Sequence, residues 1–376
     1  MQLRSFLLSG QGWPYLLVPF IPLAVVLDLA HASPIAVFFV SAAGVIPTAA
    51  LMGQATEELA ARSGPGIGGL LNVTFGNAPE IIIALFALGE GLHEVVKASL
   101  IGSMLGNILL VLGAAMFVGG LGRDRQRFDR TAASAQSAML LLAAVALVMP
   151  AIFELIAGNG LPLPGDEIRN YPSDVEHLSL AVAIVLMATY GAGLLFSLKT
   201  HRSLFNPDQT HGEEEDRGAE PWSVRKSVLM LAIAGVAVGV MSEILVGSIS
   251  EAAQGVGLSE FFIGAIVVAI VGNAAEHWVA VLVARKDHMD LAVNIAIGSS
   301  AQIALFAAPL LVLCSFFIGP HPMALVFNGF EVGGLVLAIM IANHVTNEGE
   351  STWFEGVQLL AVYVVLGLTF LFAGSS

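Results

Sequence analysis

Long apolar runs, separated by short charged or Gly/Pro-rich stretches, follow one another along almost the whole chain. Each run can supply the roughly 20 helical residues that cross about 30 Å of hydrocarbon. Within lipid, a helix satisfies its own backbone hydrogen bonds, so these runs predict an all-α polytopic membrane protein. Eleven transmembrane helices are expected, near 13–30, 34–60, 66–89, 94–120, 131–157, 176–198, 223–249, 258–284, 289–318, 322–345 and 351–373.

Composition agrees with this pattern. Apolar residues make up 56% of the 376 residues and charged residues 12%, whereas a soluble domain carries roughly a quarter charged residues. The lipid bilayer is therefore the expected surrounding, and the net charge of −14 argues against nucleic acid as a partner. The single cysteine, Cys314, excludes a disulfide framework or a thiolate metal site. We expect no resident cofactor.

The distribution of basic residues predicts the orientation. With the N-terminus inside, thirteen Lys and Arg residues fall on the inner side, and only Lys97 and Arg169 fall outside. Since basic loops stay in the cytoplasm, this bias predicts a cytoplasmic N-terminus and an external C-terminus. A bacterial plasma membrane is expected, because the sequence begins without a long targeting extension.

One short motif occurs twice. Residues 76–80 (Gly-Asn-Ala-Pro-Glu) match residues 272–276 (Gly-Asn-Ala-Ala-Glu), 196 positions later, and Gly-Ser at 102–103 matches 298–299 at the same offset. Two halves of five spans each would enter the membrane from opposite sides, which gives the inverted repeats typical of secondary transporters. The predicted units are an N-terminal helix (1–32), a first five-helix repeat (33–199), an acidic cytoplasmic linker (200–221) and a second repeat (222–376).

Each copy of the motif places an acid inside an apolar span. A carboxylate at that depth costs several kcal/mol unless it is paired, hydrated or bound to a cation, and neither span has a Lys or Arg at its centre. Asn77 precedes Glu80 by three positions, as Asn273 precedes Glu276, so each pair shares a helix face. Glycine, with Pro79 in the first copy, predicts a helix broken at the motif. Two facing copies would supply carboxylate, amide and backbone oxygens, the ligands that Ca²⁺ prefers.

Neighbouring spans add polar groups to this predicted site. Ser103, Ser299 and Gln302 are candidate cation or proton ligands. Packing of small residues is the alternative for the two serines, and hydrogen bonding between helices is the alternative for the two asparagines.

Four more ionisable residues are candidates for gates or a proton pathway. Glu57 and Glu58 end the second span near the cytoplasm, and Glu243 lies in a similar stretch of the seventh span, facing outside. Helix-end glutamates that reach out to water are the alternative interpretation. His277 directly follows Glu276 and would tune or carry protons, although a histidine bonded to a neighbouring helix explains it equally well.

Ca²⁺ and H⁺ would compete for the same carboxylate oxygens, and this competition is what an antiporter requires. An empty, doubly ionised site is costly to move through the membrane, so leak is suppressed. We therefore predict a secondary antiporter that exports cytosolic Ca²⁺ in exchange for H⁺ by alternating access. The alternatives are a Na⁺-driven or Mn²⁺ exchanger, a passive channel, and an intramembrane metal enzyme, for which the spans hold no HExxH motif. The oligomeric state, including a homo-oligomer, stays open.

Several runs resemble the calcium/proton antiporters, the cation/proton exchanger branch of the calcium/cation antiporter superfamily. The resemblance implies an eleven-helix fold with Ca²⁺ between the two Gly-Asn-x-x-Glu helices. It also implies that Glu80 and Glu276 carry Ca²⁺ and H⁺, helped by the neighbouring Asn, Ser and Gln residues, while Glu57 and Glu243 serve the gates. The runs that carry the resemblance are residues 55–60, 75–80 and 97–107 in the first half, and 242–248, 271–277, 298–306 and 347–356 in the second.

Overall fold

Helices make up nearly all of the part of the chain that the computed structural model describes, which is residues 12–63, 68, 71, 74–165, 171–196 and 222–374. Within these residues the only strands are two of two residues each. The predicted acidic linker at 200–221 lies outside the described residues, and so does Arg169.

The first half of the chain contains ten described elements. They are η1 (Trp13–Leu17), α2 (Phe20–Leu29), α3 (Pro34–Arg62), α5 (Ala78–Gly89), α6 (His93–Leu105), η2 (Gly106–Val111), α7 (Leu112–Gly120), β1 (Gln126–Arg127), α8 (Arg130–Ile156) and α9 (Ser173–Leu195).

The second half has a similar series. Its elements are α11 (Val224–Gly247), α12 (Ile249–Val256), α13 (Glu260–Phe262), η4 (Ile263–Val268), α14 (Ala269–Arg285), α15 (Met289–Gln302), η5 (Ile303–Ala307), α16 (Ala308–Ser315), α17 (Gly329–Thr346), β2 (Glu350–Ser351) and α18 (Trp353–Ala373).

Nine helices within the described residues are long and apolar enough to cross a membrane, and Trp13–Leu29 and Ala78–Gly89 are shorter apolar helices. The polytopic all-helical class is therefore confirmed, while the count of eleven spans stays a prediction. The expected start of the tenth span at 322 is wrong, since its helix begins at Gly329. Asn328 caps this helix and forms a reciprocal capping box with Glu331, which fixes the start because both side chains satisfy backbone N–H groups there.

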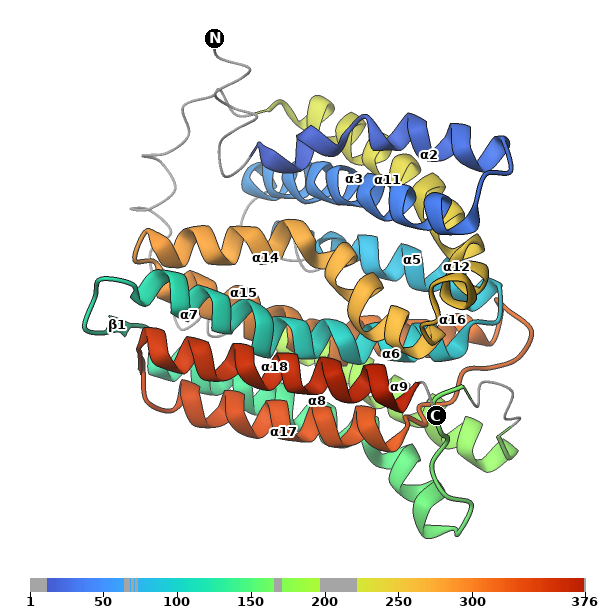
Figure 1. Cartoon of the computed structure of the whole chain (residues 1–376). Coiled ribbons are helices and arrows are strands. Elements are labelled where there is room, and N and C mark those ends of the chain that lie inside the picture. The colour runs from blue at the N-terminus through green and yellow to red at the C-terminus, as the bar shows by residue number, and fades with distance from the viewer. Residues whose placement is uncertain are drawn as a thin grey trace.

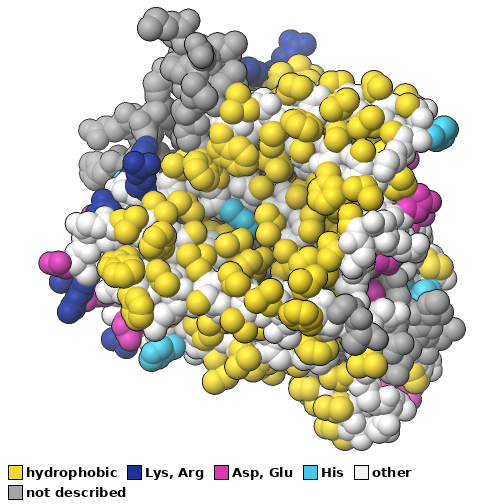
Figure 2. Space-filling view, in the orientation of Figure 1, with side chains coloured by type: hydrophobic (Ala, Val, Ile, Leu, Met, Phe, Trp, Pro, Cys, Tyr) yellow, Lys and Arg dark blue, Asp and Glu magenta, His cyan; other side chains and the backbone are white. Residues whose placement is uncertain are grey.

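The helices form layers (Figure 1). Helices α2, α3 and α11 pack together on one side of the bundle, and α8, α17 and α18 lie on the other. Helices α5, α6, α7, α14 and α15 lie between these groups. Hydrophobic side chains cover most of the face seen in Figure 2, and Lys and Arg side chains gather toward one end of it. This distribution is what a lipid-facing surface with one basic end requires.

The internal repeat is visible in the element boundaries. The α6–η2–α7 helix begins at His93 and the α15–η5–α16 helix at Met289, at the repeat offset of the sequence, and each contains a π-helical segment. Helix α6 lies so close to η4 that a Cβ atom at Gly102 would overlap the carbonyl oxygen of Ala265. Glycine at this position therefore permits the contact between the halves. The inverted arrangement of the halves stays a prediction.

A small clip joins two loops at the basic end. Strand β1 pairs with β2 in antiparallel fashion, and Glu350 accepts ion pairs from Arg125 at 2.6 Å and from Arg127 at 3.3 Å. The hydrogen bond from Arg125 lowers the pKa of the partly exposed Glu350 carboxyl. Because the clip connects the loop after α7 to the loop before α18, it ties the two halves together.

Candidate functional site

The first copy of the motif forms a helix start within the bundle. Asn77 is the N-cap residue of α5, with φ −93° and ψ 13°, and Pro79 and Glu80 occupy the first turn. Proline suits this turn because its missing N–H has no helical partner there, and an acid at a helix N-terminus meets the positive end of the dipole. The break predicted for this copy is confirmed.

The second copy differs. Gly272, Asn273 and Glu276 lie inside the continuous helix α14, so the break predicted for this copy is wrong. Ala275 stands where the first copy has Pro79, and it keeps the backbone N–H that an uninterrupted helix requires. The irregular backbone precedes the motif instead, in the π-helical segment η4.

The two acids lie close together across the halves. A Cβ atom at Gly272 would be 3.2 Å from Cγ of Glu80, and a Cβ atom at Gly76 would be 3.8 Å from Oε1 of Glu276. Each glutamate thus lies against the glycine of the other copy. A small residue at each of these positions leaves room for the opposite side chain.

The motif asparagines also bond across the halves. Nδ2 of Asn77 donates to Oε1 of Gln302 at 2.8 Å, and Nδ2 of Asn273 donates to Oγ of Ser103 at 3.0 Å. Among the described residues, three buried oxygens of the site have no hydrogen-bond partner: Oδ1 of each asparagine and Oε2 of Glu80. A buried polar atom without a partner is costly, so these oxygens are suited to a cation or a proton.

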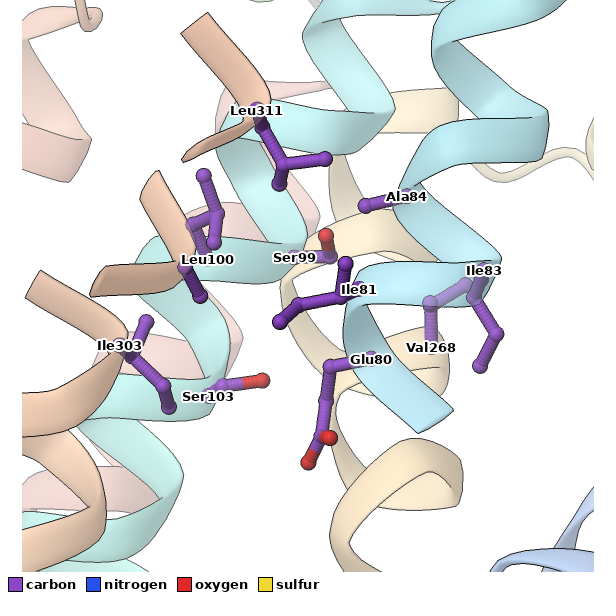
Figure 3. Close-up of a pocket in the computed structure, with 11 residues that line it drawn as sticks. Glu80, Ile81, Ile83, Ala84, Ser99, Leu100, Ser103, Val268, Ile303 and Leu311 are labelled. Carbon is purple, nitrogen blue, oxygen red and sulfur yellow. The ribbon is translucent and has the colours of Figure 1, made fainter. Parts of the chain in front are cut away.

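Serines of the neighbouring helices complete the site. Oγ of Ser299 donates to Oε2 of Glu276 at 3.1 Å. Figure 3 shows the Ser103 hydroxyl of α6 directed toward Glu80 of α5. The structure therefore brings together all seven residues that the sequence predicts as cation or proton ligands; their role as ligands stays a prediction.

His277 lies on the same helix, one residue beyond Glu276. Its Nε2 is 3.1 Å from Oδ1 of Asn107, whose Nδ2 is buried and has no partner among the described residues. Asn107 is not among the site residues predicted from the sequence. A buried amide in an otherwise apolar run is the signal that could have found it, since such a group requires a partner.

The predicted gate residues differ in exposure. Glu57 and Glu243 are exposed, whereas Glu58 is partly buried. Oε2 of Glu58 accepts from the backbone N–H of Trp222 at 3.0 Å, just before α11. Glu58 therefore connects the end of α3 to the start of the second half.

The donor set suits a hard cation. No group of three or more His, Cys, Asp and Glu residues able to hold a metal occurs in the described part of the chain. Any cation would thus depend on two carboxylates together with neutral amide and hydroxyl oxygens. Such all-oxygen shells are typical of Ca²⁺ rather than of Zn²⁺ or Cu²⁺.

Long apolar helices around a small buried cluster of polar residues define this chain as an integral membrane protein. The family model described as sodium/calcium exchanger protein matches residues 33–199 and 226–372, and the chain belongs to this family. The chain is 44% identical over 351 residues to the Ca²⁺/H⁺ antiporter ChaA of Bacillus subtilis (strain 168), covering 93% of this chain and 96% of the relative. It is 37% identical to the vacuolar calcium ion transporter of Schizosaccharomyces pombe (strain 972), covering 95% and 84%. These relatives are transporters rather than enzymes, and so is this chain.

Solved structures agree with this assignment. Native YfkE superposes with a TM-score of 0.78 at 39% identity, covering 96% of this chain and 99% of that one. The H⁺/Ca²⁺ exchanger CAX has a TM-score of 0.67 at 14% identity, covering 97% and 93%. At that identity, the likeness to CAX concerns the fold alone.

Proposed function

We propose that this protein is a secondary antiporter that exports cytosolic Ca²⁺ in exchange for H⁺. The observation that carries the proposal is the pair of acids Glu80 and Glu276, each packed against the motif glycine of the other half. The unpartnered oxygens of Asn77 and Asn273 beside them support the same function. Relatives named Ca²⁺/H⁺ antiporters, 44% and 41% identical, support the choice of ions.

In this proposal Ca²⁺ is the cargo and binds between α5 and α14. The two glutamates neutralise its charge, while the amide oxygens of Asn77 and Asn273 and neighbouring hydroxyl groups fill its shell together with water. The hydrogen bonds from the asparagine amides to Gln302 and Ser103 direct Oδ1 away from those partners. The amides thereby offer oxygen rather than N–H to the cation.

Protonation of both glutamates is the alternative way to neutralise the site. Ca²⁺ and H⁺ therefore exclude each other, and the site crosses between the two faces only when it is loaded with one or the other. In the cytosol Ca²⁺ displaces the protons. On the external side, protons that enter down their own gradient bind the glutamates and displace Ca²⁺.

We further propose eleven spans, with two inverted five-helix repeats that alternate access around the site. The equal offset of α6–η2–α7 and α15–η5–α16 supports the repeat. The basic loops support a cytoplasmic N-terminus, and the bacterial relative supports a bacterial plasma membrane. Glu57 and Glu58 then serve the cytoplasmic mouth, Glu243 serves the external one, and His277 relays or tunes protons beside Glu276.

The test is ⁴⁵Ca²⁺ uptake into proteoliposomes that hold the purified protein. We expect uptake when the lumen is acidic, collapse of uptake by a protonophore, and no uptake with an imposed Na⁺ gradient alone. Excess Mn²⁺ in a parallel sample measures selectivity. Uptake that follows the Na⁺ gradient and ignores ΔpH would refute proton coupling, and uptake without any counter-ion gradient would indicate a channel.

A further inference from the structure

A hollow opens at the basic end of the molecule, where α7 and α14 end side by side. Val118, Leu121, Gly122, Arg123 and Arg285 line it. The hollow is therefore half apolar and half cationic. It is separate from the site between Glu80 and Glu276, and the proposed transport mechanism does not use it.

Arg123 is held in a fixed position. Its Nη1 donates to the carbonyl of Gly119 at 2.5 Å, and its Nη2 donates to the carbonyl of Arg285 at 3.2 Å. Its Nε lies 3.5 Å from Oδ1 of Asp287. Arg123 therefore caps the ends of two helices. Because a guanidinium has five N–H donors, it also retains N–H groups for a further acceptor.

Arg285 supplies the second positive charge. It is exposed in the last turn of α14, and no ion pair of its side chain occurs among the described residues. Asp287 is the one carboxylate in contact with Arg123 within the described part of the chain. The hollow is therefore lined by two guanidinium groups and no carboxylate, and Asp287 offsets the charge of Arg123 alone, which leaves the hollow positively charged.

The hollow lies at the depth of the membrane surface. Both helices belong to apolar segments that are long enough to span a bilayer, and these segments end at Gly120 and Arg285. Leu121, on its wall, is 54% exposed. Figure 2 shows Lys and Arg side chains at this end beside the hydrophobic face. With the proposed orientation, this end meets the cytoplasmic leaflet, where anionic lipids attract basic residues.

We infer that this hollow binds the phosphate of an anionic phospholipid, with Arg123 and Arg285 on the phosphate and Val118 and Leu121 against its acyl chains. Arginine suits this role because its planar fork matches phosphate oxygens. A free phosphate ion would use the charges but not the apolar wall. A lipid uses both, so the combination of the two favours a lipid.

Native mass spectrometry of the detergent-solubilised full chain tests this inference. Phosphatidylglycerol is titrated against phosphatidylcholine, and inorganic phosphate serves as the soluble competitor. We expect Arg285→Gln to weaken phosphatidylglycerol binding about fivefold, the effect of one basic side chain near an anionic surface. Arg285→Lys keeps the charge but loses the planar fork, so it should weaken binding less than Arg285→Gln does. The matched control is Arg225→Gln, which removes an exposed arginine at the start of α11 that does not line the hollow.

A second variant addresses the apolar wall. Leu121→Ser should weaken phosphatidylglycerol binding and leave the folded state intact, because this side chain is already exposed. Unchanged binding in both Arg285→Gln and Leu121→Ser would overturn the inference. Equal losses in Arg285→Gln and Arg225→Gln would also overturn it, as would displacement of the lipid by equimolar phosphate. Ca²⁺ uptake is not part of this measurement, so its outcome does not depend on the proposed function.

Discussion

The two motif glycines offer a matched test of the site, because their contacts differ. At Gly272 an added methyl group would lie 3.2 Å from Cγ of Glu80, whereas at Gly76 it would lie 3.8 Å from Oε1 of Glu276. Carbon atoms prefer a separation of about 3.5–4.0 Å. Gly272→Ala therefore forces Glu80 to move by about half an ångström, and Gly76→Ala forces no movement.

The expected magnitude follows from this displacement. A misplacement of about 1 Å in a reacting geometry costs about a hundredfold, so half of that should lower Ca²⁺ uptake at limiting Ca²⁺ about tenfold in Gly272→Ala. Gly76→Ala should stay within about twofold of the parent by the same reasoning. Replacing glycine by alanine inside a helix favours the helix by up to about 1 kcal/mol. Loss of uptake in Gly272→Ala should therefore come with an unchanged or raised melting temperature.

Initial rates of ⁴⁵Ca²⁺ uptake into proteoliposomes under a fixed ΔpH measure the effect. Both variants are normalised to reconstituted protein, and their melting temperatures are compared with that of the parent. Equal rates in Gly272→Ala and the parent would refute the packing of Glu80 against Gly272. An equal fall in both variants would show that the loss arises from backbone changes rather than from the position of Glu80.

Three further predictions concern single side chains. Glu80→Gln and Glu276→Gln should each abolish exchange, because bound Ca²⁺ would lose one of its two counter-charges, and removing one partner of a buried ion pair costs about 3–5 kcal/mol. Normal uptake in either variant would exclude that residue. Ser299→Ala should lower Ca²⁺ affinity about tenfold, the effect of one hydrogen bond to a charged group, and an uptake titration measures it. At the clip, the hydrogen bond from Arg125 lowers the pKa of Glu350. The pair therefore stabilises the fold at pH values above the ordinary pKa of a carboxyl group, and this stabilisation is lost as the pH falls through the lowered pKa. A small melting-temperature gap between the parent and Glu350→Gln should therefore close on acidification and in high salt, and a gap that persists in acid would contradict this.

The sequence by itself determined the class of protein and most of the helix positions. An apolar run of about 20 residues in lipid satisfies its own backbone hydrogen bonds by forming a helix. The helices from Pro34 and Arg130 accordingly begin within a residue of the predicted positions. The duplicated motif also identified the candidate residues, because an acid in an apolar run is conspicuous without any coordinates.

Only the tertiary structure decided how these residues meet. Periodicity describes one helix at a time, so it could not indicate that each glutamate packs on the glycine of the opposite half or that Asn107 contacts His277. It also predicted a break at Gly272, where the structure has a continuous helix. The contacts join residues more than 150 positions apart, so the packing of the two halves sets them rather than any local pattern.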